Sequence, residues 1–91
     1  MTTIKARDVK ANLPKKGFVE DRSRDHINYW YQPEGKKTVI KTKISHSAND
    51  IGDSLIGKMS RQTHLDKQQF LDLVNCPLSK EDYYEIVKKY I

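Results

Sequence analysis

The segment from Asp25 to Ser47 constrains the fold of this 91-residue chain more than any other stretch. In residues 26–31 one set of side chains alternates with another: His26, Asn28 and Trp30 against Ile27, Tyr29 and Tyr31. A second alternating run covers residues 37–44, and a Gly-bearing turn at residues 33–36 separates the two runs. Alternation with a period of two indicates β-strands, and the short connection predicts an antiparallel hairpin.

A histidine stands at each outer end of this predicted hairpin, His26 at the start of the first strand and His46 after the second. Antiparallel pairing that closes at Glu34 and Gly35 would bring the start of the first strand beside the end of the second. We therefore expect His26 and His46 to be neighbours. This proximity is the sharpest functional indication in the sequence.

The segments before the hairpin predict one helix and one short strand. An apolar stripe over residues 3–13 favours a helix, and Pro14 and Gly17 predict that it ends by Lys16. Phe18 then opens a strand, and the charged run over residues 20–25 is expected to be a turn or a solvated strand edge.

The segments after the hairpin predict helices. A Ser-x-x-Asp start at Ser47 predicts a capped helix that ends near residues 62–64, a second helix is expected over residues 67–75, and Ser79 is expected to cap the last. The fold class is therefore α+β: α-β-β-β-α with a three-stranded antiparallel sheet packed on helices, plus one or two extra C-terminal helices. The length favours a single domain, with the extension packed on the same core.

The charge of +5 is unevenly distributed along the chain. Residues 1–43 hold eleven Lys and Arg against five Asp and Glu, net +6, whereas residues 44–91 hold six against seven, net −1. A basic hairpin half favours a polyanionic partner such as nucleic acid.

The cysteine content and the hydropathy pattern predict a cytoplasmic protein. The single cysteine, Cys76, cannot form an internal disulfide, and neither a secretory signal nor an apolar run long enough to span a membrane is visible. Three histidines and one cysteine do not match the ligand spacing of structural zinc, so we expect no metal and no cofactor.

The histidine pair and the basic strand together are compatible with metal-independent RNA cleavage. Such a reaction needs a base for the ribose 2′-hydroxyl proton, an acid for the leaving oxygen, and cations beside the phosphate. In this hypothesis His26 is the principal acid–base group and His46 a second one or a phosphate contact. Candidate RNA contacts are Arg22, Arg24, Lys41 and Lys43, with Tyr29 from the aromatic set. The alternatives are that the arginine run is only a solvated loop and that the aromatic residues only pack across strands.

These features together resemble the HicA-type toxin family, also known as the YcfA-like domain, over residues 4 to about 65. The resemblance rests on the following segments: Lys16-Gly17-Phe18, Ser23-Arg24-Asp25-His26-Ile27-Asn28-Tyr29, Gly35-Lys36, Ile44-Ser45-His46-Ser47, and a helix opening at Asp50-Ile51 that carries Leu55, Met59 and Gln62. It implies a double-stranded-RNA-binding-domain-like fold for residues 1–65 and leaves residues 66–91 as a C-terminal helical extension.

The resemblance also implies a function. Members of the family are small messenger-RNA-cleaving toxins whose essential histidine corresponds to His26 here, and a HicB-type antitoxin protein neutralises them. Two other hypotheses remain open: an RNA-binding module of the same fold that does not cut, and a protein-interaction domain in which the C-terminal helices bind a partner.

Overall fold

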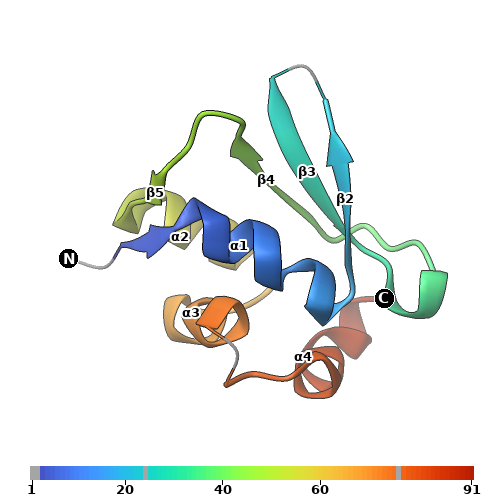
Figure 1. The fold of residues 1–91 in the computed structure, drawn as a ribbon. Coiled ribbons are helices and arrows are strands. Elements are labelled where there is room, and N and C mark those ends of the chain that lie inside the picture. The colour runs from blue at the N-terminus through green and yellow to red at the C-terminus, as the bar shows by residue number, and fades with distance from the viewer. Residues whose placement is uncertain (1–2, 24, 76) are drawn as a thin grey trace.

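A three-stranded antiparallel sheet with helices on one face forms the framework of the protein (Figure 1). The computed structural model describes residues 3–23, 25–75 and 77–91. Its elements follow in this order: β1 (Ile4–Lys5), α1 (Ala6–Asn12), the 3-10 turn η1 (Pro14–Lys16), β2 (Phe18–Arg22), β3 (His26–Tyr31), the 3-10 turn η2 (Pro33–Gly35), β4 (Lys41–Ser45), β5 (Asp50–Ile51), α2 (Asp53–Gln62), α3 (Lys67–Asn75), α4 (Lys80–Val87) and the 3-10 turn η3 (Lys88–Tyr90). The predicted α+β class and the three-stranded sheet packed on helices are confirmed.

Strand β3 is the centre of the sheet, between β2 and β4. Its three odd-numbered side chains are fully buried, whereas the three even-numbered ones are half-buried. The buried face belongs to Ile27, Tyr29 and Tyr31, and the open face to His26, Asn28 and Trp30, as the alternation predicts.

One hydrophobic core joins the sheet to all four helices. At one end of it the rings of Phe18, Tyr31 and Tyr83 pack against one another, with centroid separations of 4.9 to 5.6 Å. Since Phe18 comes from β2, Tyr31 from β3 and Tyr83 from α4, this cluster ties the last long helix to the sheet.

The C-terminal helices are also held by polar contacts to residues that precede them in the chain or lie in the segment between them. The Asn12 amide donates to the Val74 carbonyl at 2.6 Å, and the Tyr83 hydroxyl donates to the Thr63 carbonyl at 3.0 Å. The largely buried Lys16 ammonium donates to the Leu78 carbonyl. These bonds satisfy buried carbonyls that would otherwise cost free energy, so residues 66–91 pack on the same core as residues 1–65.

The helix expected to start at Ser47 begins later, so that prediction is wrong in its start. Residues Asp50 and Ile51 form β5, which pairs antiparallel with β1 in a second, two-stranded sheet. The Ser47 hydroxyl lies 3.1 Å from the Ser45 hydroxyl and caps no helix, and α2 starts at Asp53. A tertiary pairing thus overrides the local capping signal.

Strand β2 continues to Arg22, so the start of the charged run is a solvated strand edge, one of the two forms expected for it. The start of β4 differs from the prediction. Strand β4 starts at Lys41 because the Thr38 hydroxyl donates to the Tyr31 carbonyl at 2.7 Å and accepts from the Ile40 N–H at 3.2 Å. That side chain takes the Tyr31 carbonyl and the Ile40 N–H, while the Ile40 carbonyl still accepts from the Tyr31 N–H at 3.0 Å.

Candidate functional site

A small hollow of about 180 Å³ lies where β4 meets α2, at the His26 end of the sheet. It is lined by His26, Lys43, Ile44 and Ser45 from the sheet and by Leu55, Lys58 and Gln62 from α2. One imidazole, two ammonium groups, a hydroxyl and an amide therefore share a space large enough for a phosphate group. This combination is the candidate site.

The strand register brings the sheet residues of the hollow together. His26 is paired with Ser45, and Asn28 with Lys43. Residues directly opposite in an antiparallel pair point to the same side, so His26, Lys43 and Ser45 share the open face. Lys43 and Ser45 are exposed, and Lys43 forms no ion pair within the part of the chain that the structure describes.

Helix α2 supplies the other wall of the hollow. The buried Thr42 hydroxyl donates to the Gln62 Oε1 atom at 2.8 Å, which fixes the end of α2 against β4. With its oxygen used in this way, the Gln62 amide presents its nitrogen as a donor. Lys58 lies one helical turn before Gln62, so both side chains fall on the same face of α2.

The backbone around His26 is held by Ser23. The Ser23 hydroxyl donates to the His26 carbonyl at 2.8 Å, and the His26 N–H lies 3.3 Å from the same hydroxyl oxygen. The half-buried His26 ring itself makes no hydrogen bond to any residue in the described ranges. Both ring nitrogens are thus available to a ligand.

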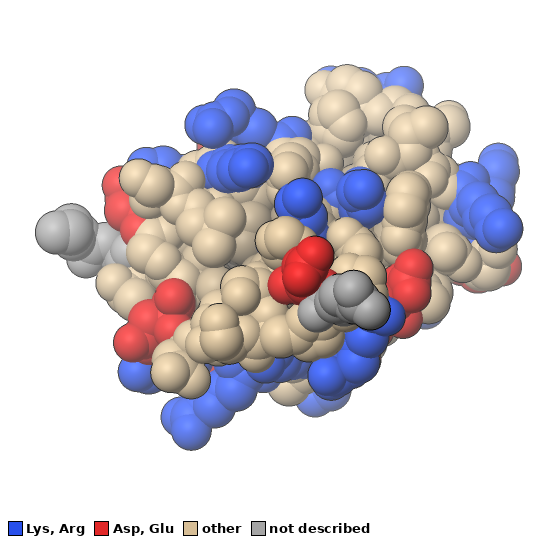
Figure 2. Space-filling model, turned by 90° about the horizontal axis from the view of Figure 1, so that it is seen from above, with Lys and Arg blue, Asp and Glu red and all other residues tan. Residues whose placement is uncertain are grey.

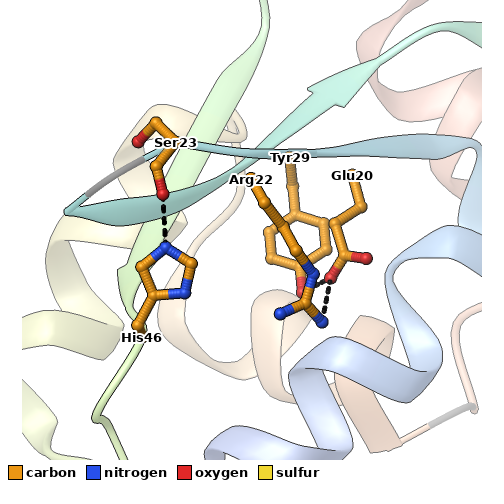
Figure 3. Close-up of polar contacts among 5 residues, drawn as sticks. All are labelled: Glu20, Arg22, Ser23, Tyr29 and His46. Atoms are coloured by element: carbon orange, nitrogen blue, oxygen red, sulfur yellow. Dashed lines mark hydrogen bonds and ion pairs between the residues drawn. The ribbon is translucent and has the colours of Figure 1, made fainter.

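His46 lies at the same end of the molecule but is not among the residues that line the hollow, and its ring points to Ser23 (Figure 3). Its Nε2 atom is 2.5 Å from the Ser23 carbonyl oxygen. A carbonyl oxygen only accepts hydrogen bonds, so the Nε2 atom of His46 carries the proton. This bond connects the loop between β4 and β5 to the turn between β2 and β3. The two histidines are close in the fold, as the hairpin predicts, yet only His26 lines the hollow.

The predicted aromatic contact, Tyr29, is wrong because its side chain is in the core. It is 0% exposed, and its hydroxyl donates to Glu20 Oε1 at 3.1 Å (Figure 3). Burial, with the Glu20 carboxylate beside it, raises the pKa of Tyr29. A ring with no exposed surface cannot stack on a base. The ring that the open face does present is Trp30.

The cationic residues named from the sequence fall into separate groups. Lys41 lies beside Trp30, with its Nζ atom 4.9 Å from the ring centroid, and belongs to the open face with Lys43. Arg22 pairs with the buried Ile27 and lies 3.4 Å from Glu20, so it is on the other face at the sheet edge. Arg24 lies outside the described residues.

The residues that α2 contributes to the hollow, Lys58 and Gln62 among them, are absent from the sequence-based site. The helical spacing of the two residues was visible, but nothing in the sequence indicates which strand α2 packs against. The third histidine, His64, takes a left-handed backbone conformation with φ of 61° and stacks on Tyr90 at 4.1 Å. It plays no part in the hollow.

The surface around the β2–β3 turn carries basic side chains in separate groups, with acidic ones between them (Figure 2). In the described ranges, no group of three or more His, Cys, Asp and Glu side chains could hold a metal ion. Over the same residues, no helix has the length and apolar character needed to cross a membrane.

Comparisons with protein-family models, with curated proteins and with solved structures find no match to this chain.

Proposed function

We propose that this protein binds RNA across the open face of its sheet and cleaves it without a metal, with His26 as the general acid–base residue. The observation that carries the proposal is the shared hollow of His26, Lys43 and Lys58. An imidazole that makes no hydrogen bond to a described residue, beside two ammonium groups, meets the requirements for proton transfer next to a phosphate.

The chemistry that fits this arrangement is attack of a ribose 2′-hydroxyl on its own 3′-phosphate. His26 takes the 2′-hydroxyl proton, the 2′-oxygen bonds to phosphorus, and the bond from phosphorus to the 5′-oxygen breaks, with solvent supplying that oxygen with a proton. Lys43 and Lys58 stabilise the negative charge that develops on the phosphorane. Because His46 is bonded to Ser23, it does not serve as the second proton-transfer group in this geometry.

Lys41 and Trp30 extend the interface along the open face. A cation held over an indole ring offers a phosphate contact and a stacking surface side by side. RNA bound in this way would run along β3 and β4 with one phosphate in the hollow.

The resemblance to HicA-type toxins adds the biological setting to this proposal. In that setting the substrate is messenger RNA, the location is the cytoplasm, and a HicB-type antitoxin protein binds the toxin. Expression of the chain alone in a bacterium should then arrest growth, and His26→Ala should relieve the arrest.

The test of cleavage compares the three histidines. Single-stranded RNA labelled at one end is incubated with the purified protein in the presence of a chelator. We expect His26→Ala to lower the cleavage rate at least ~100-fold, the usual contribution of a general acid–base group. His46→Ala and His64→Ala are the matched controls and should stay within a few-fold of the parent. Intact RNA with the parent protein, or equal loss in all three variants, would refute a catalytic His26.

A second candidate function is an RNA-binding module that does not cut. The engagement of His46 by Ser23 favours it, because a single imidazole remains in the hollow. This function predicts RNA affinity that falls steeply with salt and survives His26→Ala. The two candidate functions predict different results in the cleavage assay: the first predicts cut RNA and the second intact RNA. The same variants therefore distinguish them.

A further inference from the structure

The middle of the open face, between His26 and Trp30, is a row of three polar side chains of different chemistry. The strand register sets Asp21 of β2 and Lys43 of β4 on either side of Asn28 in β3. Residues directly opposite in antiparallel strands point to the same side, and the core and the helices lie on the other side of the sheet (Figure 1). A carboxylate, an amide and an ammonium group therefore follow one another across the open face.

A neighbouring contact shows that the Asp21 side chain belongs to the open face. The hydroxyl of the buried Tyr29 donates to Glu20 at 3.1 Å, so the Glu20 side chain is turned toward the core side of the sheet. Successive side chains of a strand point to opposite faces, which places Asp21 on the same face as Asn28. Asp21 is exposed, and Asn28 is half-buried on the central strand.

The Asp21 carboxylate lies on a face whose other charged side chains are the lysines Lys41 and Lys43. In the described ranges, neither the Asp21 carboxylate nor the Asn28 amide makes a side-chain hydrogen bond or an ion pair. A carboxylate repels phosphate, so Asp21 weakens this face as a site for the RNA backbone alone. It is suited instead to accept hydrogen bonds from the N–H groups of a base.

The pair of Asp21 and Asn28 matches the hydrogen-bonding edge of guanine. Guanine presents adjacent N–H donors at its N1 and N2 atoms, followed by the acceptor O6. The two oxygens of a carboxylate can accept from both donors at once, and an amide NH₂ group beside it can donate to O6. Adenine and cytosine each offer only one exocyclic amino donor next to a ring acceptor, and uracil offers one donor between two acceptors. Guanine is therefore the base that uses both oxygens of Asp21 together with the Asn28 amide.

We propose that Asp21 and Asn28 form a guanine-binding subsite for RNA on the open face, an inference that rests on the proposed RNA function. Asp21 accepts from N1 and N2 of the base, the Asn28 amide donates to O6, and Trp30 borders the base along β3. Residues i and i+2 of a strand are about 7 Å apart, so Asn28 lies one such step from His26. The guanine therefore belongs to a nucleotide next to the phosphate in the hollow, where Lys43 remains a phosphate contact.

The test measures the affinity of the full chain for short labelled oligonucleotides that cannot be cut. Each is a run of 2′-fluoro-uridines in which the central base is uracil, guanine, adenine, cytosine or hypoxanthine. The 2′-fluoro sugar lacks the attacking hydroxyl, so fluorescence anisotropy reports binding without cleavage. We expect the guanine oligonucleotide to bind at least ~5-fold more tightly than the other four. Hypoxanthine differs from guanine only in lacking the N2 amino group, so its weaker binding would assign the contact to that group.

Two variants assign the preference to a residue. Asp21→Asn should lower the preference for guanine over hypoxanthine from ~5-fold to below ~2-fold, because an amide oxygen replaces the carboxylate that accepts from N1 and N2. Asp82→Asn makes the same change of charge in the first turn of α4 and should keep the full preference. A preference that survives Asp21→Asn, or that both variants lose equally, would overturn the subsite.

The outcomes separate this subsite from the RNA function on which it rests. Equal affinity for all five oligonucleotides would overturn the guanine subsite and leave RNA binding intact, and tighter binding of cytosine or adenine would overturn the choice of base. No binding of any oligonucleotide would refute the subsite and RNA binding together. With cleavable RNA of mixed sequence, the parent protein should cut next to guanines and Asp21→Asn should lose that preference, whereas cutting at all bases alike by the parent would refute the subsite and leave cleavage standing.

Discussion

The two ends of strand β3 have opposite chemistry. At the His26 end, the polar groups are at the surface and the hollow is basic, with Lys43 and Lys58 in its lining. At the Tyr31 end, the Tyr31 hydroxyl is buried in the core, and a larger hollow between η2 and α4 is acidic. The two ends of one central strand therefore border hollows of opposite charge, and the net charge of the chain describes neither of them.

The largest expected effect concerns alkaline pH and the buried tyrosines. Burial raises the pKa of Tyr29, Tyr31 and Tyr83 above 10.0, for Tyr31 to about 12. Above pH 10 the unfolded chain loses these protons first, so the stability present below pH 10 is lost as the pH rises toward the folded-state values. Each tyrosine should remove about 1.4 kcal/mol per pH unit. Urea unfolding at pH 9, 10 and 11 measures this slope, and Tyr31→Phe should reduce it; a flat profile would contradict the burial.

The next effect tests whether the basic hollow carries RNA affinity. Lys43→Glu with Lys58→Glu should weaken RNA binding on the order of 100-fold at low salt, because two phosphate contacts become repulsive. Lys36→Glu with Lys80→Glu makes the same charge change at the acidic end and should have an effect below ~5-fold. Fluorescence anisotropy with labelled single-stranded RNA compares the pairs, and equal losses would mean that overall charge alone drives binding.

A third prediction compares two rings that touch each other. Tyr83→Phe should lower the free energy of unfolding by about 1 to 2 kcal/mol, because the buried Thr63 carbonyl loses its donor. Tyr31→Phe removes the same atom from the neighbouring ring, where no hydrogen bond to a described residue is lost. Urea unfolding at pH 7 should therefore show changes of opposite sign. The same sign for both would mean that the Tyr31 hydroxyl has a partner in solution.

The smallest effect separates the two histidines at one end. His46→Ala should destabilise the fold by about 0.5 to 1 kcal/mol through loss of its bond to the exposed Ser23 carbonyl. His26→Ala should change stability by less than ~0.5 kcal/mol, since its ring makes no hydrogen bond in the described ranges. Matched urea curves at pH 7 measure both, and a larger cost for His26 would give it a structural role.

Local patterns in the sequence predict most of the fold. The alternation in residues 26–31 defines β3 and its two faces, and the helical signals define α3 and the Ser79 cap, whose hydroxyl accepts from the Asp82 N–H at 3.0 Å. The pairing of β1 with β5 has no local signal, because two-residue strands form only through their partner. Ser47 and Thr38 show the same limit. The capping signal at Ser47 and the strand pattern at Thr38 are both local, whereas the structure uses these side chains in hydrogen bonds to Ser45 and Tyr31.

The candidate site depends on strand register and on helix packing. The predicted hairpin makes His26 and His46 neighbours, and the structure pairs His26 with Ser45. His46 follows the end of β4, and its ring contacts Ser23 instead of lining the hollow. Lys58 and Gln62 join His26 through helix packing, which no pattern in the sequence specifies.

The small sheet of β1 and β5 has a consequence for the order of folding. The β2–β3 hairpin and the helices close short loops, whereas pairing Ile4 with Ile51 must wait until the whole intervening segment has collapsed. We therefore expect the N-terminal strand to dock last and its amides to exchange with solvent sooner than those of β3. We expect a protease to cut the folded chain first in the segments next to the β1–β5 pairing, because this pairing opens most easily.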